Sequence, residues 1–147
     1  MQVKIRPATS DDAPAIVGLM AHLAEFGHGQ VDPGVEDRLC VMIESPGYAL
    51  LVAEDEQGQV AGLLTMSQRW TLWHRGRCAL VEELVVDRAA RRQGVGRALI
   101  QAALDWARAQ GCSEVEISTE PDNSGAQAFY RKLGFESTAL LLEYEMD

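Results

Sequence analysis

The chain has 147 residues but only three cysteines, Cys40, Cys78 and Cys112, and no two of them form a Cys-x-x-Cys pair. Its three histidines, at positions 22, 28 and 74, show no His-x-x-x-His spacing. Neither a disulfide framework nor a metal site is indicated by these spacings, although residues far apart in the sequence can meet in a fold. We therefore expect reduced, buried cysteines that act as small apolar residues, and no metal ion.

The sequence also lacks an apolar run near the roughly 18 residues that span a bilayer, and residues 1–7 lack the apolar core of a signal peptide. We expect a cytoplasmic protein without a membrane partner. The net charge of −9 disfavours a nucleic-acid partner, whose backbone requires a basic surface. A length of 147 residues predicts a single domain over residues 1–147.

Two common phosphate-binding motifs are absent as well, because the chain has neither a P-loop Gly-Lys-Ser/Thr ending nor the three glycines of a dinucleotide fingerprint. Instead, a glycine turn at residues 91–96 follows an apolar, strand-like run at 80–86 and opens a helical pattern at 97–110. The first amides of a helix and the positive end of its dipole bind phosphate oxygens. The turn predicts an anion site, or else a simple strand-to-helix connection.

Four arginines, Arg88, Arg91, Arg92 and Arg97, surround this turn. Cations at a helix start oppose the helix dipole, so stability alone does not explain them. An anionic ligand does.

A second segment lies downstream, where Asn123 precedes Tyr130 by seven residues and Gly134-Phe135 follows. The turn and this segment, in this order, resemble the two signatures of the GCN5-related N-acetyltransferase (GNAT) family. The resemblance covers nearly the whole chain and is strongest over residues 81–135. It implies an acetyl-CoA-dependent N-acetyltransferase that acts on a primary amine by direct attack in a ternary complex.

Hydrophobic periodicity predicts an α/β fold in the order βααβββαβαβ. The expected strands are residues 3–6, Tyr48–Ala53, Val60–Met66, Leu80–Val86, Glu114–Thr119 and Ala139–Met146, with a short extra strand at Phe135–Ser137. The expected helices run over residues 9–26, 33–44, 97–110 and 124–133. The sheet should be mixed and mostly antiparallel, with helices on both faces. The resemblance further implies that two parallel strands splay apart and form the acetyl-CoA cleft.

By resemblance, the co-substrate acetyl-CoA is held mainly by main-chain groups. The pantetheine amides should pair with the carbonyls of Leu84 and Val86, and the thioester carbonyl should meet the N–H of Val85 or Val86. The phosphates should bind the turn, and the amide of Asn123 should contact the cofactor arm or cap a helix, or do both. The turn residues concerned are Arg91, Arg92, Gln93, Gly94, Val95, Gly96 and Arg97.

Two side chains are candidates for proton transfer. Tyr130 matches the family tyrosine that protonates the leaving thiolate, although a Phe-Tyr pair on an amphipathic helix is also typical of a core. Glu82 matches a carboxylate that some members use as a base through water. Because neighbouring strand residues point to opposite faces, we expect only one of Glu82 and Glu83 in the cleft, partly desolvated by apolar neighbours and thus with a raised pKa. A surface salt bridge is the alternative.

The acceptor is the least specified partner. Acidic residues expected at its entrance favour a small cationic amine, although acidic surface also serves solubility alone. Trp70, Trp73 and His74 could line the acceptor pocket, or the tryptophans could fill core or a subunit contact in an expected homodimer. A protein or peptide acetyltransferase and a non-catalytic CoA-binding regulatory domain remain open. The acidic residues are Glu25, Asp32, Glu36, Asp37 and Glu82.

Overall fold

A computed structural model describes residues 1–24 and 29–146 of the chain. They form two compact units, one of residues 1–116 and one that starts at Ile117. In the described part of the chain, every helix is too short or too polar to cross a membrane.

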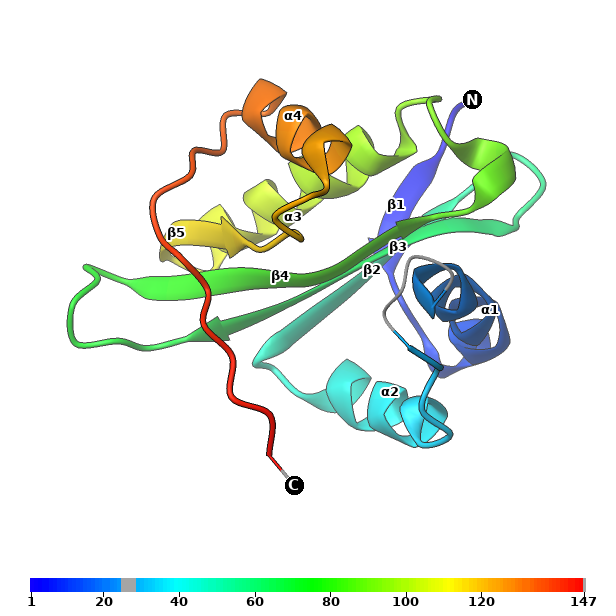
Figure 1. The fold of residues 1–147 in the computed structure, drawn as a ribbon. Helices are drawn as coiled ribbons and strands as arrows, with labels where there is room; N and C mark the ends of the chain where they lie inside the picture. Colours follow the sequence, from blue (N-terminus) through cyan, green and yellow to red (C-terminus); the bar gives the residue numbers. More distant parts are fainter. Residues whose placement is uncertain (25–28, 147) are drawn as a thin grey trace. The chain divides into compact units, whose positions relative to one another are not determined.

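The first unit contains a five-stranded sheet in the order β1-β2-β3-β4-β5 (Figure 1). The first four strands pair antiparallel with their sequence neighbours, and β4 and β5 form a parallel pair. The helix between β4 and β5 provides the long crossover that parallel strands require. The strands are β1 (Lys4–Pro7), β2 (Tyr48–Glu54), β3 (Val60–Arg69), β4 (Arg77–Val86) and β5 (Cys112–Ile117).

Helices cover both faces of this sheet. The helices α1 (Ala13–Leu23) and α2 (Val35–Glu44) lie on one face, and α3 (Val95–Ala109) lies on the other (Figure 1). On the α1 and α2 face, Ile16 and Leu39 belong to one buried cluster with Leu63 of β3 and Val85 of β4. The predicted fold class, an α/β fold with a mixed, mostly antiparallel sheet, is confirmed.

An ion-pair network holds the N-terminus of α1 in place. Arg6 of β1 donates two hydrogen bonds to the Asp12 carboxylate, at 2.8 and 2.9 Å, and a third to Glu54 at 2.6 Å. The Arg6 guanidinium lowers the pKa of Asp12, which is 7% exposed. The network therefore joins two strands to the start of the helix that covers them. Residues 25–28, at the expected end of this first helix, lie outside the described residues.

Several element bounds differ from expectation by a few residues. The helix α3 begins at Val95 and not at Arg97, because Gly94 rather than Gly96 ends the turn. The strand β5 begins at Cys112, directly after Gly111, whose positive φ of 79° ends the helix. The strand β4 begins at Arg77, three residues before the apolar run.

In the second unit, α4 spans Ser124–Lys132, and the described chain continues to Met146 without a further helix or strand. The predicted strands at Ala139–Met146 and Phe135–Ser137 are therefore wrong in the described chain. A strand needs a hydrogen-bonded neighbour, and an apolar sequence pattern does not supply one. The aliphatic residues from Leu140 to Leu142 are exposed here.

Candidate functional site

The turn between β4 and α3 has an unusual backbone. Gly94 caps α3 in the left-handed region with φ 85°, and Arg92 also has a positive φ of 62°. The first intrahelical bond runs from the Ala98 N–H to the Gly94 carbonyl at 3.0 Å, so the amides of residues 95–97 precede the hydrogen-bonded helix. Amides in this position, together with the positive end of the helix dipole, are able to bind an anion.

Neighbouring hydrogen bonds hold this turn in place. The Asp87 carboxylate accepts from the Ala89 N–H at 2.9 Å and caps a short 3-10 helix, Arg88–Ala90. The Gln93 side-chain amide donates to the Ala89 carbonyl at 3.1 Å, and Arg91 Nε donates to the Val86 carbonyl at 3.2 Å. The turn is thus tied to the end of β4 by its own side chains.

The hydrogen-bond pattern of β4 shows which of its residues direct their N–H and C=O groups toward β3 and which direct them to the other edge. The Asp87 N–H donates to the Ala61 carbonyl of β3 at 2.8 Å, and the register from Glu83 to Val86 is regular. Because successive residues of a strand alternate between its two edges, the main chain of Val85 faces β3. Leu84 and Val86 direct their N–H and C=O groups to the opposite edge, on the side of β5. Of the two predicted oxyanion donors, this alternation favours Val86.

A β-bulge changes the expected orientation of the two glutamates. Thr65 pairs with Glu83 and Met66 pairs with Val81, so Glu82 is an extra residue in β4. The Thr65 hydroxyl donates to the Glu83 carboxylate, and the Ser67 hydroxyl donates to Glu82 at 3.3 Å.

Thr65 and Ser67 lie two residues apart on β3 and share the sheet face of Leu63, which α1 and α2 cover. The prediction that the two glutamates point to opposite faces is therefore wrong, because a bulge places two successive residues opposite one partner. The expected desolvation of Glu82 is not found either, since its side chain is exposed. Thr65 and Ser67, whose hydroxyls bind the two carboxylates, were not among the predicted residues, although they stand out after the apolar start of β3.

The second unit carries the remaining predicted residues. Asn123 caps α4, and its side-chain oxygen accepts from the Ala126 N–H at 3.0 Å, as predicted for a helix cap. The ring of Tyr130 lies 5.3 Å from the Phe129 ring and 5.9 Å from the Phe135 ring, measured between centroids. Burial raises the pKa of the Tyr130 hydroxyl, so it remains protonated at neutral pH.

The loop between β3 and β4 is largely exposed. Trp70 and Trp73 are 71% and 91% exposed, so the alternative that they fill the core is wrong. The Arg77 guanidinium lies 4.9 Å from the centroid of the Trp70 ring. His74 does not join the glutamates of β4. Instead, its Nε2 lies 3.1 Å from a carboxylate oxygen of Glu114 in β5, and this oxygen accepts the hydrogen bond.

Comparison with known proteins gives a consistent result. The chain matches the model of the acetyltransferase (GNAT) family over residues 18–135. It is 29% identical over 143 residues to an uncharacterized N-acetyltransferase, YhfO, of Bacillus subtilis strain 168, with 97% of this chain and 95% of the relative covered. It is 30% identical over 138 residues to the type 1 aminoglycoside N(6')-acetyltransferase of Klebsiella aerogenes, with 92% and 90% covered.

Among solved structures, the fold resembles that of a transcriptional regulator from Bacillus halodurans C-125, with a TM-score of 0.89. The alignment covers 99% of this chain and all of that one, at 24% sequence identity. At this identity the likeness concerns the fold alone.

Proposed function

The chain belongs to the GNAT family of acetyltransferases, and we propose that it transfers the acetyl group of acetyl-CoA to a primary amine of a small, cationic acceptor. As a member of this family it is an acyltransferase. The observation that carries the proposal is the turn after β4, where Arg92 and Gly94 adopt positive φ and the first amides of α3 precede its hydrogen bonds.

This turn fits the pyrophosphate of acetyl-CoA. Residues 95–97 offer consecutive main-chain donors, and the side chains of Arg92 and Arg97 are exposed beside them. Backbone donors bind phosphate oxygens without requiring a particular side chain, while the arginines add attraction for the anion. The turn therefore supplies geometry and charge together.

The pantetheine arm is proposed to lie along the edge of β4 that faces away from β3, at Leu84 and Val86. Leu84 and Val86 direct their main-chain groups to that edge, which suits pairing with the two amides of the arm in the manner of an added strand. Asn123 is proposed to contact the same arm through its amide nitrogen, since its side-chain oxygen already accepts from Ala126.

The proposed reaction moves two protons. The amine nitrogen attacks the thioester carbon, the carbon–sulfur bond breaks, and the departing thiolate takes a proton from the Tyr130 hydroxyl. Glu82 accepts, through water, the proton that the ammonium form loses before the attack, and the proton that nitrogen loses after the attack returns through solvent to Tyr130. The Val86 N–H stabilises charge on the carbonyl oxygen. Because an alkyl amine has a pKa near about 10, most of it is protonated at neutral pH, and a base is therefore needed.

The acceptor is proposed to be cationic because negative charge collects on the α1 and α2 face. The carboxylates of Glu82 and Glu83 lie on this face of the sheet, and Glu36 and Asp37 occupy the first turn of α2. Such a surface concentrates cations. An aminoglycoside acetyltransferase among the relatives supports the same class of acceptor. Of the residues predicted for this entrance, Glu25 lies outside the described residues.

A thiol-release screen tests the proposal directly. Purified protein is mixed with acetyl-CoA and with amines of each charge class, namely polyamines, aminoglycosides, basic amino acids, neutral amines and anionic amines. We expect release of CoA with the cationic members and little with the others. Preference for anionic amines would contradict the acceptor class. Calorimetric binding of acetyl-CoA without turnover of any amine would point to a non-catalytic CoA-binding domain.

The role of Tyr130 can be tested separately. Tyr130→Phe removes only the hydroxyl, and we expect kcat to fall roughly 100-fold, the usual contribution of general acid–base catalysis. Affinity for acetyl-CoA should be nearly unchanged, and Phe129→Leu serves as the control for packing in α4. Full activity of Tyr130→Phe would assign the ring to packing alone.

A further inference from the structure

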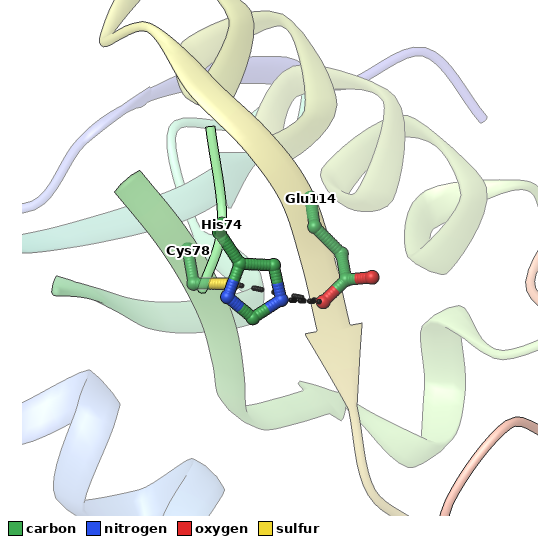
Figure 2. A group of neighbouring side chains, drawn as sticks. All are labelled: His74, Cys78 and Glu114. Carbon is green, nitrogen blue, oxygen red and sulfur yellow. Dashed lines mark hydrogen bonds and ion pairs between the residues drawn. The ribbon is translucent and has the colours of Figure 1, made fainter. Parts of the chain in front are cut away.

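Three potential metal ligands converge at the start of β4, away from the turn described above. His74 lies in the loop that precedes β4, Cys78 lies in β4, and Glu114 lies in β5 (Figure 2). Their ligand atoms all lie within 4.8 Å of one another. His74 Nε2 lies 3.1 Å from Glu114 Oε2, and Cys78 Sγ lies 3.6 Å from the same oxygen.

The fold holds the loop firmly against β5. A side chain at Gly76 would place its Cβ 2.5 Å from the Gly111 carbonyl oxygen, so only glycine allows this close approach. Gly76, two residues after His74, therefore lies directly beside the start of β5. This contact explains how residues 40 positions apart in the sequence come to share one site.

The Thr71 hydroxyl fixes the orientation of the His74 imidazole through its Nδ1. This nitrogen lies 2.7 Å from the Thr71 hydroxyl, and the main-chain N–H of His74 donates to the same hydroxyl at 3.0 Å. This leaves Nε2 as the nitrogen that faces Glu114 and Cys78. Histidines that ligate metals typically have their second ring nitrogen held in this way by an outer partner.

The charges around the cluster favour a cation. Cys78 is fully buried, and its thiol donates to the carboxylate of Glu114 at 3.6 Å. Arg69, which lies opposite Cys78 on β3, is paired with Glu116 at 2.9 Å. A bound divalent ion would compensate the negative charge of the carboxylate and of the thiolate that replaces the thiol.

We propose that His74, Cys78 and Glu114 form a binding site for a divalent metal ion of the zinc class. Zinc bonds of about 2.0–2.3 Å in a tetrahedron place ligand atoms roughly 3.3–3.6 Å apart, close to the two separations that share Glu114 Oε2. One nitrogen, one sulfur and one oxygen ligand suit a borderline-soft ion, whereas magnesium and calcium take oxygen ligands. The fourth position is open to water, on the side of the partly exposed Glu114.

The ion would fasten the loop to two strands at once. It would connect His74 of the loop to the edge strand β5 through Glu114 and to the core of the sheet through Cys78. The exposed Trp70 and Trp73 belong to this loop, so the metal would restrict the part of the chain that carries them. Binding also displaces the thiol proton of Cys78, which passes to the solvent.

The experiment uses the full chain with Cys40→Ser, because the exposed Cys40 thiol could bind zinc by itself. The protein is stripped with a chelator and titrated with zinc in a calorimeter, then with cobalt while the thiolate-to-cobalt absorption band is followed. Cys78→Ser replaces the proposed sulfur ligand by a hydroxyl. Cys112→Ser makes the same replacement at a thiol outside the cluster and serves as the matched control.

We expect one zinc ion per chain, a loss of affinity of more than about 100-fold in Cys78→Ser, and a cobalt band that disappears in this variant and persists in Cys112→Ser. Thr71→Val removes only the partner behind His74 and should weaken binding about 10- to 100-fold. If Cys78→Ser does not fold, the same titrations are made on Glu114→Gln and Thr71→Val, which change less buried residues and should likewise weaken zinc binding. No zinc binding to the parent chain, or a cobalt band that survives Cys78→Ser, would overturn the proposal.

Discussion

The two ends of β4 offer different chemical groups, main-chain amides at one end and side chains at the other. After Val86, the chain enters a turn whose donors are main-chain amides of consecutive residues, and two positive φ values shape it. Near Cys78, at the other end, three side chains from a loop and two strands converge on one another. The first arrangement is local in the sequence, and the second spans residues 74 to 114.

This difference determines which substitutions should abolish binding at each end of β4. A main-chain site depends on the conformation of the turn, so it tolerates most side-chain changes and fails where a glycine is required. A side-chain cluster depends on donor atoms, so it fails when a single ligand is replaced while the backbone remains intact. Between the two ends lie Glu82 and Glu83, at the bulge, where both the backbone and the side chains matter.

Along β4, the largest loss of turnover is expected at the bulge. Glu82→Gln removes the proposed base while retaining the hydrogen-bond acceptor for Ser67, and we expect kcat to fall about 100-fold at neutral pH. The variant should recover as pH rises toward the pKa of the acceptor amine, because a larger fraction of the amine is then unprotonated. A pH–rate profile of the variant beside that of the parent chain measures both effects.

Glu83→Gln is the matched control for Glu82. The Glu83 carboxylate is engaged by the Thr65 hydroxyl, and its main-chain N–H donates to the same hydroxyl at 3.2 Å, so this residue is more closely tied to the sheet. We expect the smaller loss of kcat here. A larger loss in Glu83→Gln would transfer the role of base to it, and unchanged rates in both variants would mean that water alone suffices.

A smaller effect is expected in the turn. Gly94→Val places a β-branched residue at φ 85°, where strain of about 1–3 kcal/mol distorts the start of α3, so affinity for acetyl-CoA should fall roughly 10- to 100-fold. Gly58→Val imposes a similar strain at φ 78° in the hairpin between β2 and β3 and controls for stability alone. Calorimetric titration of folded variants compares them. Equal affinities in Gly94→Val and the parent chain would rule out the turn as the phosphate site.

The turn after β4 was predictable because its determinants are adjacent in the sequence. An apolar run, glycines at 94 and 96 and a helical pattern mark the junction, and the structure differs only in which glycine ends the turn. The helix α4 and its cap at Asn123 were predictable for the same reason. Local backbone conformation and helix capping are properties that a few neighbouring residues can specify.

The bulge and the cluster could not be predicted in this way. Strict alternation assigned Glu82 and Glu83 to opposite faces, because a bulge appears only when the register between β3 and β4 is known. The cluster of His74, Cys78 and Glu114 depends instead on the pairing of β4 with β5 and on the close approach of Gly76 to Gly111. The expected strand at 139–146 failed for a related reason, since its partner is not specified by its own residues.

The smallest expected effect concerns charge. The turn carries exposed arginines, whereas the α1 and α2 face carries carboxylates, on a chain whose net charge is −9. If both attract their ligands by long-range fields, kcat/KM for a cationic acceptor at saturating acetyl-CoA should fall several-fold as salt shortens the Debye length from about 30 to 8 Å. A neutral amine of similar size should show little change.

Neutralising the start of α2 with Glu36→Gln and Asp37→Asn should flatten the salt dependence of kcat/KM for the cationic acceptor, without changing the salt dependence of acetyl-CoA binding at the arginine turn. Equal salt dependence for cationic and neutral acceptors would show that the acidic face serves solubility and has no part in the choice of acceptor.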